Sequence, residues 1–278
     1  LIIPSSSPVR LRLTNMEVSS LSREGYKSRA NKTVWIFTIV YFGITIAAFL
    51  CYWLAGMDSF DAINHAFSVV STGGFSTKDL SIATYNSAAI NLITMFFMLI
   101  ASIHFGLIFM VFATRSLKPL NNPVLKFYVL SIVISALLVS LSLKFQGTCF
   151  TWGQSLMTGF FHVISAISTT GFAISDNNTW PLFACIITII ITIPCGMAGS
   201  TTGGIKADRM LLIFKTIGQQ VKNVVHPSSI NRLHIGNHIL DKDEIYPHVV
   251  FMCLYFITIG ASVALTIMSG MDVQNAVA

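Results

Sequence analysis

The sequence predicts an all-α membrane protein built from a repeated helical unit, and three observations lead to this fold class. Of the 278 residues, 54% are hydrophobic and only 10% are charged, whereas soluble domains carry about 25% charged residues. Uncharged apolar runs recur that are long enough to cross a bilayer. The segments 71–75 and 168–172 read Ser-Thr-Gly-Gly-Phe and Ser-Thr-Thr-Gly-Phe. Such an internal repeat decides how the rest of the chain is read.

The similarity between the two copies extends upstream of these segments. Matching pairs, each separated by the same interval, are Gly56 and Gly153, His65 and His162, Ser68 and Ser165, and Ser71 and Ser168. We define residues 34–115 as the first repeat and residues 127–222 as the second repeat. A third copy begins at Gly270, which we expect to be cut off inside the repeat, so the chain has the character of a fragment. We expect no signal peptide, because the first residues lack its charged and apolar regions.

The first repeat follows a polar, Arg-rich segment, residues 1–33. Residues 34–55 are apolar and long enough for one transmembrane helix. Residues 58–70 are amphipathic at spacings of three and four, which predicts a helix too short to span. The segment 71–75 follows directly, and a second span is expected at 88–113.

The second repeat has the same order of elements. A basic turn-rich loop, 116–126, leads to a span at 127–143. Then follow a short helix at 152–167, the segment 168–172, and an apolar run that Pro194 interrupts. The remaining predictions are a Gly-rich break at 194–206, a helical pattern at 210–217, a polar connector at 223–246 and a last span at 248–268.

The charges predict how the chain crosses the membrane. If the chain starts inside and each short helix dips in from outside, 15 of the 17 Lys and Arg residues lie on the inner side. This agrees with the positive-inside rule, and the reverse orientation does not. The net charge of +6 therefore reflects topology rather than nucleic-acid binding. Carboxylates would concentrate cations at the outer mouth, and they are Asp58, Asp61, Asp79, Asp176 and Asp272.

The repeated Ser/Thr-Gly segments have the chemistry of a cation site. Irregular backbone at membrane depth occurs only where protein buries it or water lines it. Glycine allows successive carbonyl groups to turn toward a common axis, and a helix that ends there directs the negative end of its dipole at that point. Rings of backbone carbonyls replace the hydration shell of potassium in selectivity filters. The alternative is that each segment is only a loop between helices. The presence of two copies at equivalent positions argues against it.

These segments, together with the sequence Pro-Cys-Gly-Met-Ala-Gly-Ser-Thr-Thr-Gly-Gly-Ile-Lys at 194–206, resemble the TrkH/KtrB/HKT superfamily of potassium transporters. The second sequence is similar to that family's Gly-Ser-Thr-Ala-Gly-Gly-Ile-Lys and is the more specific signal. The resemblance covers essentially the whole chain. It implies four helix–pore-helix–helix units around a pseudo-fourfold ion pore, of which this chain holds unit two (34–115), unit three (127–222) and the start of unit four (247–278).

The resemblance also implies the site residues, the ions and the partners. The filter would be formed by Ser71, Thr72, Gly73, Gly74, Ser168, Thr169, Thr170 and Gly171. An intramembrane gating loop would contain Gly196, Gly199, Ser200, Thr201, Thr202, Gly203, Gly204 and Lys206. Potassium ions would occupy the filter, with no covalent cofactor. Expected partners are the lipid bilayer, a second copy in a homodimer and a cytosolic nucleotide-binding ring of the TrkA or KtrA kind, at the bacterial inner membrane with the basic loops cytoplasmic.

Several alternatives stay open at this stage. A sodium-permeable or potassium/sodium cotransporting member of the same superfamily would share this pattern. A membrane-embedded enzyme would need a nucleophile with a base, paired acids or a metal cluster within the spans, which carry essentially no acidic residues. Lys206 either places a cation near the inner mouth or anchors the chain at the interface. His65, His104 and His162 are either structural or functional, and we favour hydrogen bonding and packing.

Overall fold

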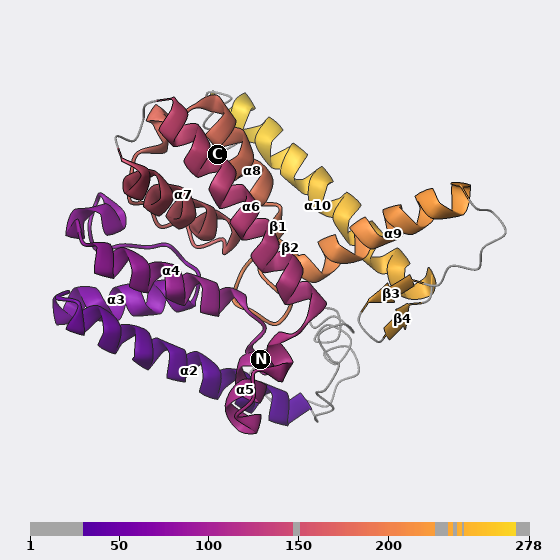
Figure 1. Cartoon of the computed structure of the whole chain (residues 1–278), viewed down its shortest axis with the longest axis horizontal. Coiled ribbons are helices and arrows are strands. Elements are labelled where there is room, and N and C mark those ends of the chain that lie inside the picture. The colour runs from indigo at the N-terminus through magenta and orange to yellow at the C-terminus, as the bar shows by residue number, and fades with distance from the viewer. Residues whose placement is uncertain (1–29, 147–150, 226–232, 236–237, 241, 271–278) are drawn as a thin grey trace. The chain divides into compact units, whose positions relative to one another are not determined.

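A computed structural model describes residues 30–146, 151–225, 233–235, 238–240 and 242–270 (Figure 1). The chain forms two compact units that divide after Asp208, and each is described by itself. The structure is dominated by helices, so the predicted all-α class is confirmed. Most of the predicted segment 1–33 lies outside the described residues.

The first repeat contains α2 (Ala30–Leu54), α3 (Ser59–Val70), η2 (Ser81–Tyr85), α4 (Ala88–Ser102) and α5 (Phe105–Thr114). The short helix α3 packs against α2 and α4 (Figure 1). Small residues make this close packing possible, because Ala48 of α2 and Ala62 and Ala66 of α3 are fully buried. The Tyr52 hydroxyl donates to Thr94 at 3.0 Å and so joins α2 to α4.

The second repeat contains α6 (Pro123–Phe145), α7 (Trp152–Ile167), η4 (Asn177–Thr179) and α8 (Leu182–Ile191), after η3 (Lys118–Leu120). Its helices start where the sequence provides caps. Asn122 accepts a hydrogen bond from Val124 with Pro123 in the first turn of α6. Thr151 and Gln154 form a capping box at the start of α7. The short helix α7 packs on α6, α8 and α4, and its contact with α4 joins the two repeats.

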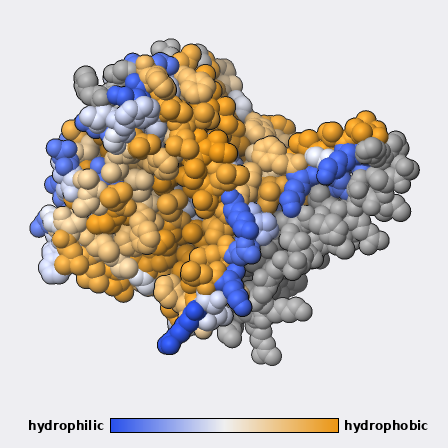
Figure 2. Space-filling model, viewed as in Figure 1, coloured by the Kyte–Doolittle hydropathy of each residue, from blue (hydrophilic) through white to orange (hydrophobic). Residues whose placement is uncertain are grey.

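The described residues include three helices that are long and apolar enough to cross a membrane, namely Val34–Leu54, Pro123–Phe145 and Tyr246–Met268. The bent pair α4–α5 is a fourth if both helices are read as one span. Figure 2 shows apolar side chains over much of the face that includes α6 and α8, where Leu130, Ile134 and Ile190 are at least half exposed. Apolar surface on this scale requires lipid or protein to cover it.

The span predicted at 88–113 is broken into two helices. α4 ends at Ser102 and α5 begins at Phe105, with an angle of 98° between them. Ile103 is in an extended conformation, and the side chain of His104 caps α5 by accepting a hydrogen bond from Gly106. A helix break leaves backbone groups that need new partners, and a segment of the second repeat supplies them, as shown below.

The helical prediction after the Gly-rich break was too short. α9 extends over Ala207–Val225, well past the predicted end at 217, and α10 over Lys242–Met268, starting before the predicted 248. The predicted connector 223–246 also contains strands β3 (Leu233–Ile235) and β4 (His238–Leu240), paired antiparallel. Apolar periodicity defines the amphipathic face of a helix but not where a polar continuation ends.

Candidate functional site

The two Ser/Thr-Gly segments have the same backbone conformation. The C-cap residue of α3 and of α7 is a serine, Ser71 and Ser168 respectively. The next residue is in the left-handed region in each copy, with φ 54° at Thr72 and 53° at Thr169. The fourth residue of each segment also has positive φ, 69° at Gly74 and 86° at Gly171. The repeat seen in the sequence is therefore a repeat of backbone geometry.

Equivalent hydrogen bonds hold these turns. In the first copy, Gly73 N donates to the carbonyl of Ser68 at 2.8 Å. In the second, Thr170 N donates to the carbonyl of Ser165 at 3.0 Å. A left-handed threonine costs free energy unless its surroundings hold it in place. These bonds, and the threonine side-chain contacts described below, supply that restraint.

The two segments lie directly against each other. A Cβ atom added at Gly74 would overlap the carbonyl oxygen of Thr170. The ring of His65 on α3 stacks on Phe172 with 5.9 Å between ring centroids. Beyond the segments, Ala83 N donates to the carbonyl of Ala173 at 3.3 Å. The close approach at Gly74 explains why this position has no side chain.

The C-terminal ends of α3 and α7 both meet these segments, so two helix dipoles present their negative ends there. Among the described residues, no group of three or more His, Cys, Asp and Glu side chains could hold a metal ion. The polar groups that the two Ser/Thr-Gly segments contain are backbone carbonyls and hydroxyl groups. Such ligands suit hard, weakly binding alkali cations rather than transition metals.

The Gly-rich break folds into a closed loop. Strands β1 (Pro194–Cys195) and β2 (Ile205–Lys206) pair in parallel and join its two ends. The buried carboxylate of Asp208 accepts a hydrogen bond from Ala198 N at 2.7 Å. Non-helical backbone at membrane depth needs internal partners of this kind. We call residues 194–206, which are predicted from the sequence to lie within the membrane, the intramembrane loop.

The intramembrane loop contacts both Ser/Thr-Gly segments. Thr201 Oγ1 donates to the carbonyl of Val70, the last residue of α3, at 2.8 Å. Thr72 Oγ1 donates to the carbonyl of Thr201 at 3.1 Å. Gly203 N donates to Thr169 Oγ1 at 2.9 Å. The left-handed threonine of each copy is therefore the residue that contacts the loop.

The same loop fills the break between α4 and α5. The carbonyl of Ala101 accepts from Thr201 N at 3.3 Å and from Thr201 Oγ1 at 3.1 Å. The carbonyl of Ser102 accepts from Met197 N at 2.9 Å, and Phe105 N donates to the carbonyl of Gly199 at 3.1 Å. The backbone groups released by the break are the ones that hold the loop. Sequence reasoning missed this contact, and its only signal was the polar His104 within an apolar run.

The remaining predicted residues lie as follows. The Lys206 ammonium donates to the carbonyl and hydroxyl oxygens of Thr202, within its own loop. His104 lies under the loop, where a Cβ at Gly199 would be 2.5 Å from its Nδ1. The other two histidines each bond to a serine beyond their Ser/Thr-Gly segment: His65 to Ser76 at 2.9 Å and His162 to Ser175 at 3.1 Å. The two serines do not occupy equivalent positions of the repeat. These contacts agree with the hydrogen bonding and packing that we favoured.

The fold and this arrangement define an all-helical membrane protein with a repeated carbonyl-rich turn, and comparison with known proteins identifies its family. The family model TrkH, described as a cation transport protein, matches residues 6–276. The chain belongs to the TrkH family. It is 34% identical over 245 residues to the Trk system potassium uptake protein TrkH of Escherichia coli K12, covering 87% of this chain and 50% of that protein. Its relatives are ion transport proteins, not enzymes.

Two further relatives support the assignment. TrkG of Escherichia coli K12, also a Trk system potassium uptake protein, is 32% identical over 211 residues, which cover 76% of this chain and 43% of that protein. The crystal structure of the potassium transporter TrkH from Vibrio parahaemolyticus matches with a TM-score of 0.85 and 31% identity, covering 92% of this chain and 56% of that one. The chain spans about half the length of the curated relatives it matches.

Proposed function

We propose that this chain forms two quarters of the pore of a Trk-type potassium uptake protein. Residues 34–115 would be unit two, 127–222 unit three and 247–278 the start of unit four. The observation that carries the proposal is the repeated turn after α3 and α7, with matched positive φ angles and direct contact between the copies. The half of the relatives that this chain does not match would supply the other two quarters.

Potassium ions, as the transported substrate, would be held by carbonyl groups of the turns. The proposed filter comprises Ser71, Thr72, Gly73, Gly74, Ser168, Thr169, Thr170 and Gly171. Carbonyl oxygens can replace the hydration shell of potassium, and the helix dipoles of α3 and α7 favour a cation there. A sodium-permeable member of the same family is the second candidate, since the carbonyl ligands of these two turns would suit either ion.

The intramembrane loop is proposed to be the gate. Its residues Gly196, Gly199, Ser200, Thr201, Thr202, Gly203, Gly204 and Lys206 follow the unit-three filter in the chain. The loop contacts the end of α3 and the second Ser/Thr-Gly segment. In the position described, it would obstruct the path below the filter. Movement of the loop would require breaking its hydrogen bonds to the α4–α5 break.

The membrane setting and partners complete the proposal. The protein would lie in the bacterial inner membrane with its basic loops in the cytoplasm, since most Lys and Arg residues then fall on the inner side. A homodimer and a cytosolic nucleotide-binding ring that docks on the basic inner face are the proposed partners. The ring would act on the loop through α9, which directly follows it.

The test is potassium and sodium flux into liposomes that contain the full-length parent protein, with and without Gly171→Asp. We expect selective potassium flux in the wild type and its loss in the variant, because a carboxylate in the filter would narrow it and bind cations tightly. Normal potassium flux in correctly folded Gly171→Asp protein would contradict the filter assignment. Equal potassium and sodium flux in the wild type would favour the second candidate.

A further inference from the structure

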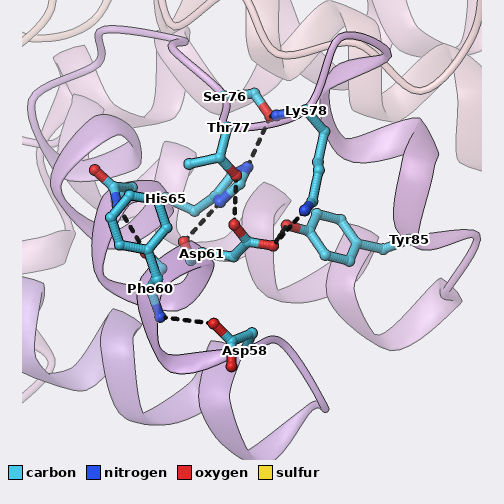
Figure 3. Close-up of polar contacts among 9 residues, drawn as sticks. Asp58, Phe60, Asp61, His65, Ser76, Thr77, Lys78 and Tyr85 are labelled. Atoms are coloured by element: carbon cyan, nitrogen blue, oxygen red, sulfur yellow. Dashed lines mark hydrogen bonds and ion pairs between the residues drawn. The ribbon is translucent and has the colours of Figure 1, made fainter.

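The chain that leaves the first Ser/Thr-Gly segment is tied to the start of α3 by a single carboxylate (Figure 3). Asp61 lies in the first turn of α3 and is only 7% exposed. Its Oδ1 accepts from the Thr77 hydroxyl at 2.7 Å, and its Oδ2 accepts from the Tyr85 hydroxyl at 2.8 Å. The Lys78 ammonium forms an ion pair with the same Oδ2 at 3.1 Å.

Two of these donors lie just beyond the first Ser/Thr-Gly segment. Thr77 and Lys78 come three and four residues after Gly74, and the preceding Ser76 is bonded to His65 Nε2 at 2.9 Å (Figure 3). Three consecutive residues beyond the turn are therefore fixed to one helix. The turn itself is fixed at its other end by the C-terminus of the same helix. The first segment is thus held from both sides by α3.

The electrostatics favour a permanently charged carboxylate. Hydrogen bonding from Thr77, with further help from Tyr85 and Lys78, lowers the pKa of Asp61 to about 2, although burial opposes this shift. The position in the first helical turn is favourable for an anion. A buried carboxylate with this many donors holds them firmly, because removing one partner leaves a buried group unsatisfied.

The second repeat has no carboxylate at this position of its short helix. Thr158 occupies the position equivalent to Asp61. There the chain beyond the segment is held by the hydrogen bond between His162 and Ser175, and Trp180 packs on the His162 ring with 4.7 Å between centroids. A histidine–serine contact occurs in both repeats, whereas the carboxylate at this helix position occurs in the first and is replaced by a threonine in the second.

We propose that Asp61 is a positioning residue for ion selectivity, which acts by clamping residues 76–78 and so fixing the carbonyl groups of Gly73 and Gly74. The inference rests on the proposed function and adds to it a residue outside the filter. In the cavity-size account of selectivity, a carbonyl cage held at the spacing for potassium does not contract around the smaller sodium ion, whereas a loosened cage does. Asp61 does not contact the ion in this account, because its oxygens are occupied by the clamp.

The competing explanation is that Asp61 is one of several outer carboxylates that concentrate cations. Asp58 provides a matched control. It is exposed, lies three residues away on the same turn, and caps α3 by accepting from Phe60 N at 3.2 Å rather than contacting residues 76–78 (Figure 3). Asp58→Asn removes the same charge from the same mouth and leaves the clamp in place.

The experiment measures potassium and sodium flux in liposomes with the full-length wild type, Asp61→Asn and Asp58→Asn at low and high ionic strength. We expect Asp61→Asn to lower the potassium-to-sodium flux ratio by about tenfold, equivalent to 1.4 kcal/mol, and Asp58→Asn to leave the ratio unchanged. Thr77→Val removes a donor without changing the charge, so it should lower the ratio in the same direction and serves if Asp61→Asn does not fold.

The possible results distinguish failure of the Asp61 clamp from failure of the proposed potassium transport. An unchanged ratio in folded Asp61→Asn and Thr77→Val would overturn the clamp. So would equal effects of Asp61→Asn and Asp58→Asn that disappear at high ionic strength, since surface charge is screened by salt. A wild type that carries no potassium would instead contradict the proposed function itself.

Discussion

The two Ser/Thr-Gly segments share a backbone and differ in their surroundings. Both follow a short helix, and both place a threonine and a glycine at positive φ. The first segment is crowded, because Gly74 lies against the carbonyl of Thr170. At Gly171, within the part of the chain that the structure describes, no atom lies within 4 Å of an added Cβ. The repeated sequence determines the backbone conformation of each turn. The contacts with the other repeat determine whether a side chain can be accommodated at its glycine.

The intramembrane loop also contacts the two repeats unequally. It belongs to the second repeat in sequence, yet most of its hydrogen bonds to other segments go to the first repeat, at Val70, Thr72 and the α4–α5 break. Its contact with the second segment is the bond from Gly203 to Thr169. The first repeat therefore acts as the platform that holds the loop, in addition to providing its own turn.

The largest expected effect comes from adding one methyl group to each glycine. Both Gly74→Ala and Gly171→Ala incur the strain of a left-handed alanine, about 1–2 kcal/mol. Gly74→Ala also forces the two segments apart, since the methyl group overlaps the carbonyl of Thr170. We expect Gly74→Ala to abolish potassium flux in liposomes and Gly171→Ala to retain a measurable part of it.

Equal loss of potassium flux in both alanine variants would contradict the expected difference, because it would mean that the two copies are equally crowded in the full-length protein. Amounts of folded protein, measured by size-exclusion chromatography after purification, are the required control. A reversed order, with Gly171→Ala the more severe, would show that another part of the protein closes on Gly171.

A smaller effect is expected where the loop rests on the first repeat. Gly199 has φ 79°, and a Cβ there would lie 2.5 Å from Nδ1 of His104. Gly199→Ala should push the loop off the α4–α5 break and raise basal potassium flux, by about 5- to 30-fold if the displacement costs 1–2 kcal/mol of loop docking.

His104→Ala in the same chain tests whether contact with the His104 ring causes the increase in basal flux. It removes the ring that the new methyl group meets, so the double variant Gly199→Ala, His104→Ala should return toward wild-type flux. Basal flux that stays at the wild-type level or falls in folded Gly199→Ala protein would count against the loop as a gate. Additive effects of the two changes would show that they act at independent places.

The sequence predicted the repeat well, because its signals are local. Gly74 and Gly171 are glycines for a conformational reason, and α7 has the bounds predicted for it, since Thr151 caps it and Ser168 ends it. The fold class followed from uncharged apolar runs that are long enough to cross a bilayer. The family resemblance rested on the loop sequence at 194–206, and the comparisons confirm the family.

The sequence did not predict the contacts between the repeats, because these depend on partners far apart in the chain. Neither Gly nor Pro occupies residues 103–104, where the helix breaks, and this break is stabilised by loop residues about 100 positions later. Asp61 was interpreted only as one outer carboxylate among five. Its donors Thr77 and Lys78 come from an irregular stretch of chain, and Tyr85 is the last residue of η2. The role of each predicted filter and loop residue stays a prediction.

The most direct measurement is the anomalous scattering of rubidium in crystals of the full-length parent protein. The account predicts a peak on the pore axis within about 3 Å of carbonyl oxygens from residues 72–74 and 169–171, at the distance typical of close oxygen contacts. A rubidium peak elsewhere in the membrane region, with none at these carbonyls, would contradict the claim that the two repeated turns form the ion filter.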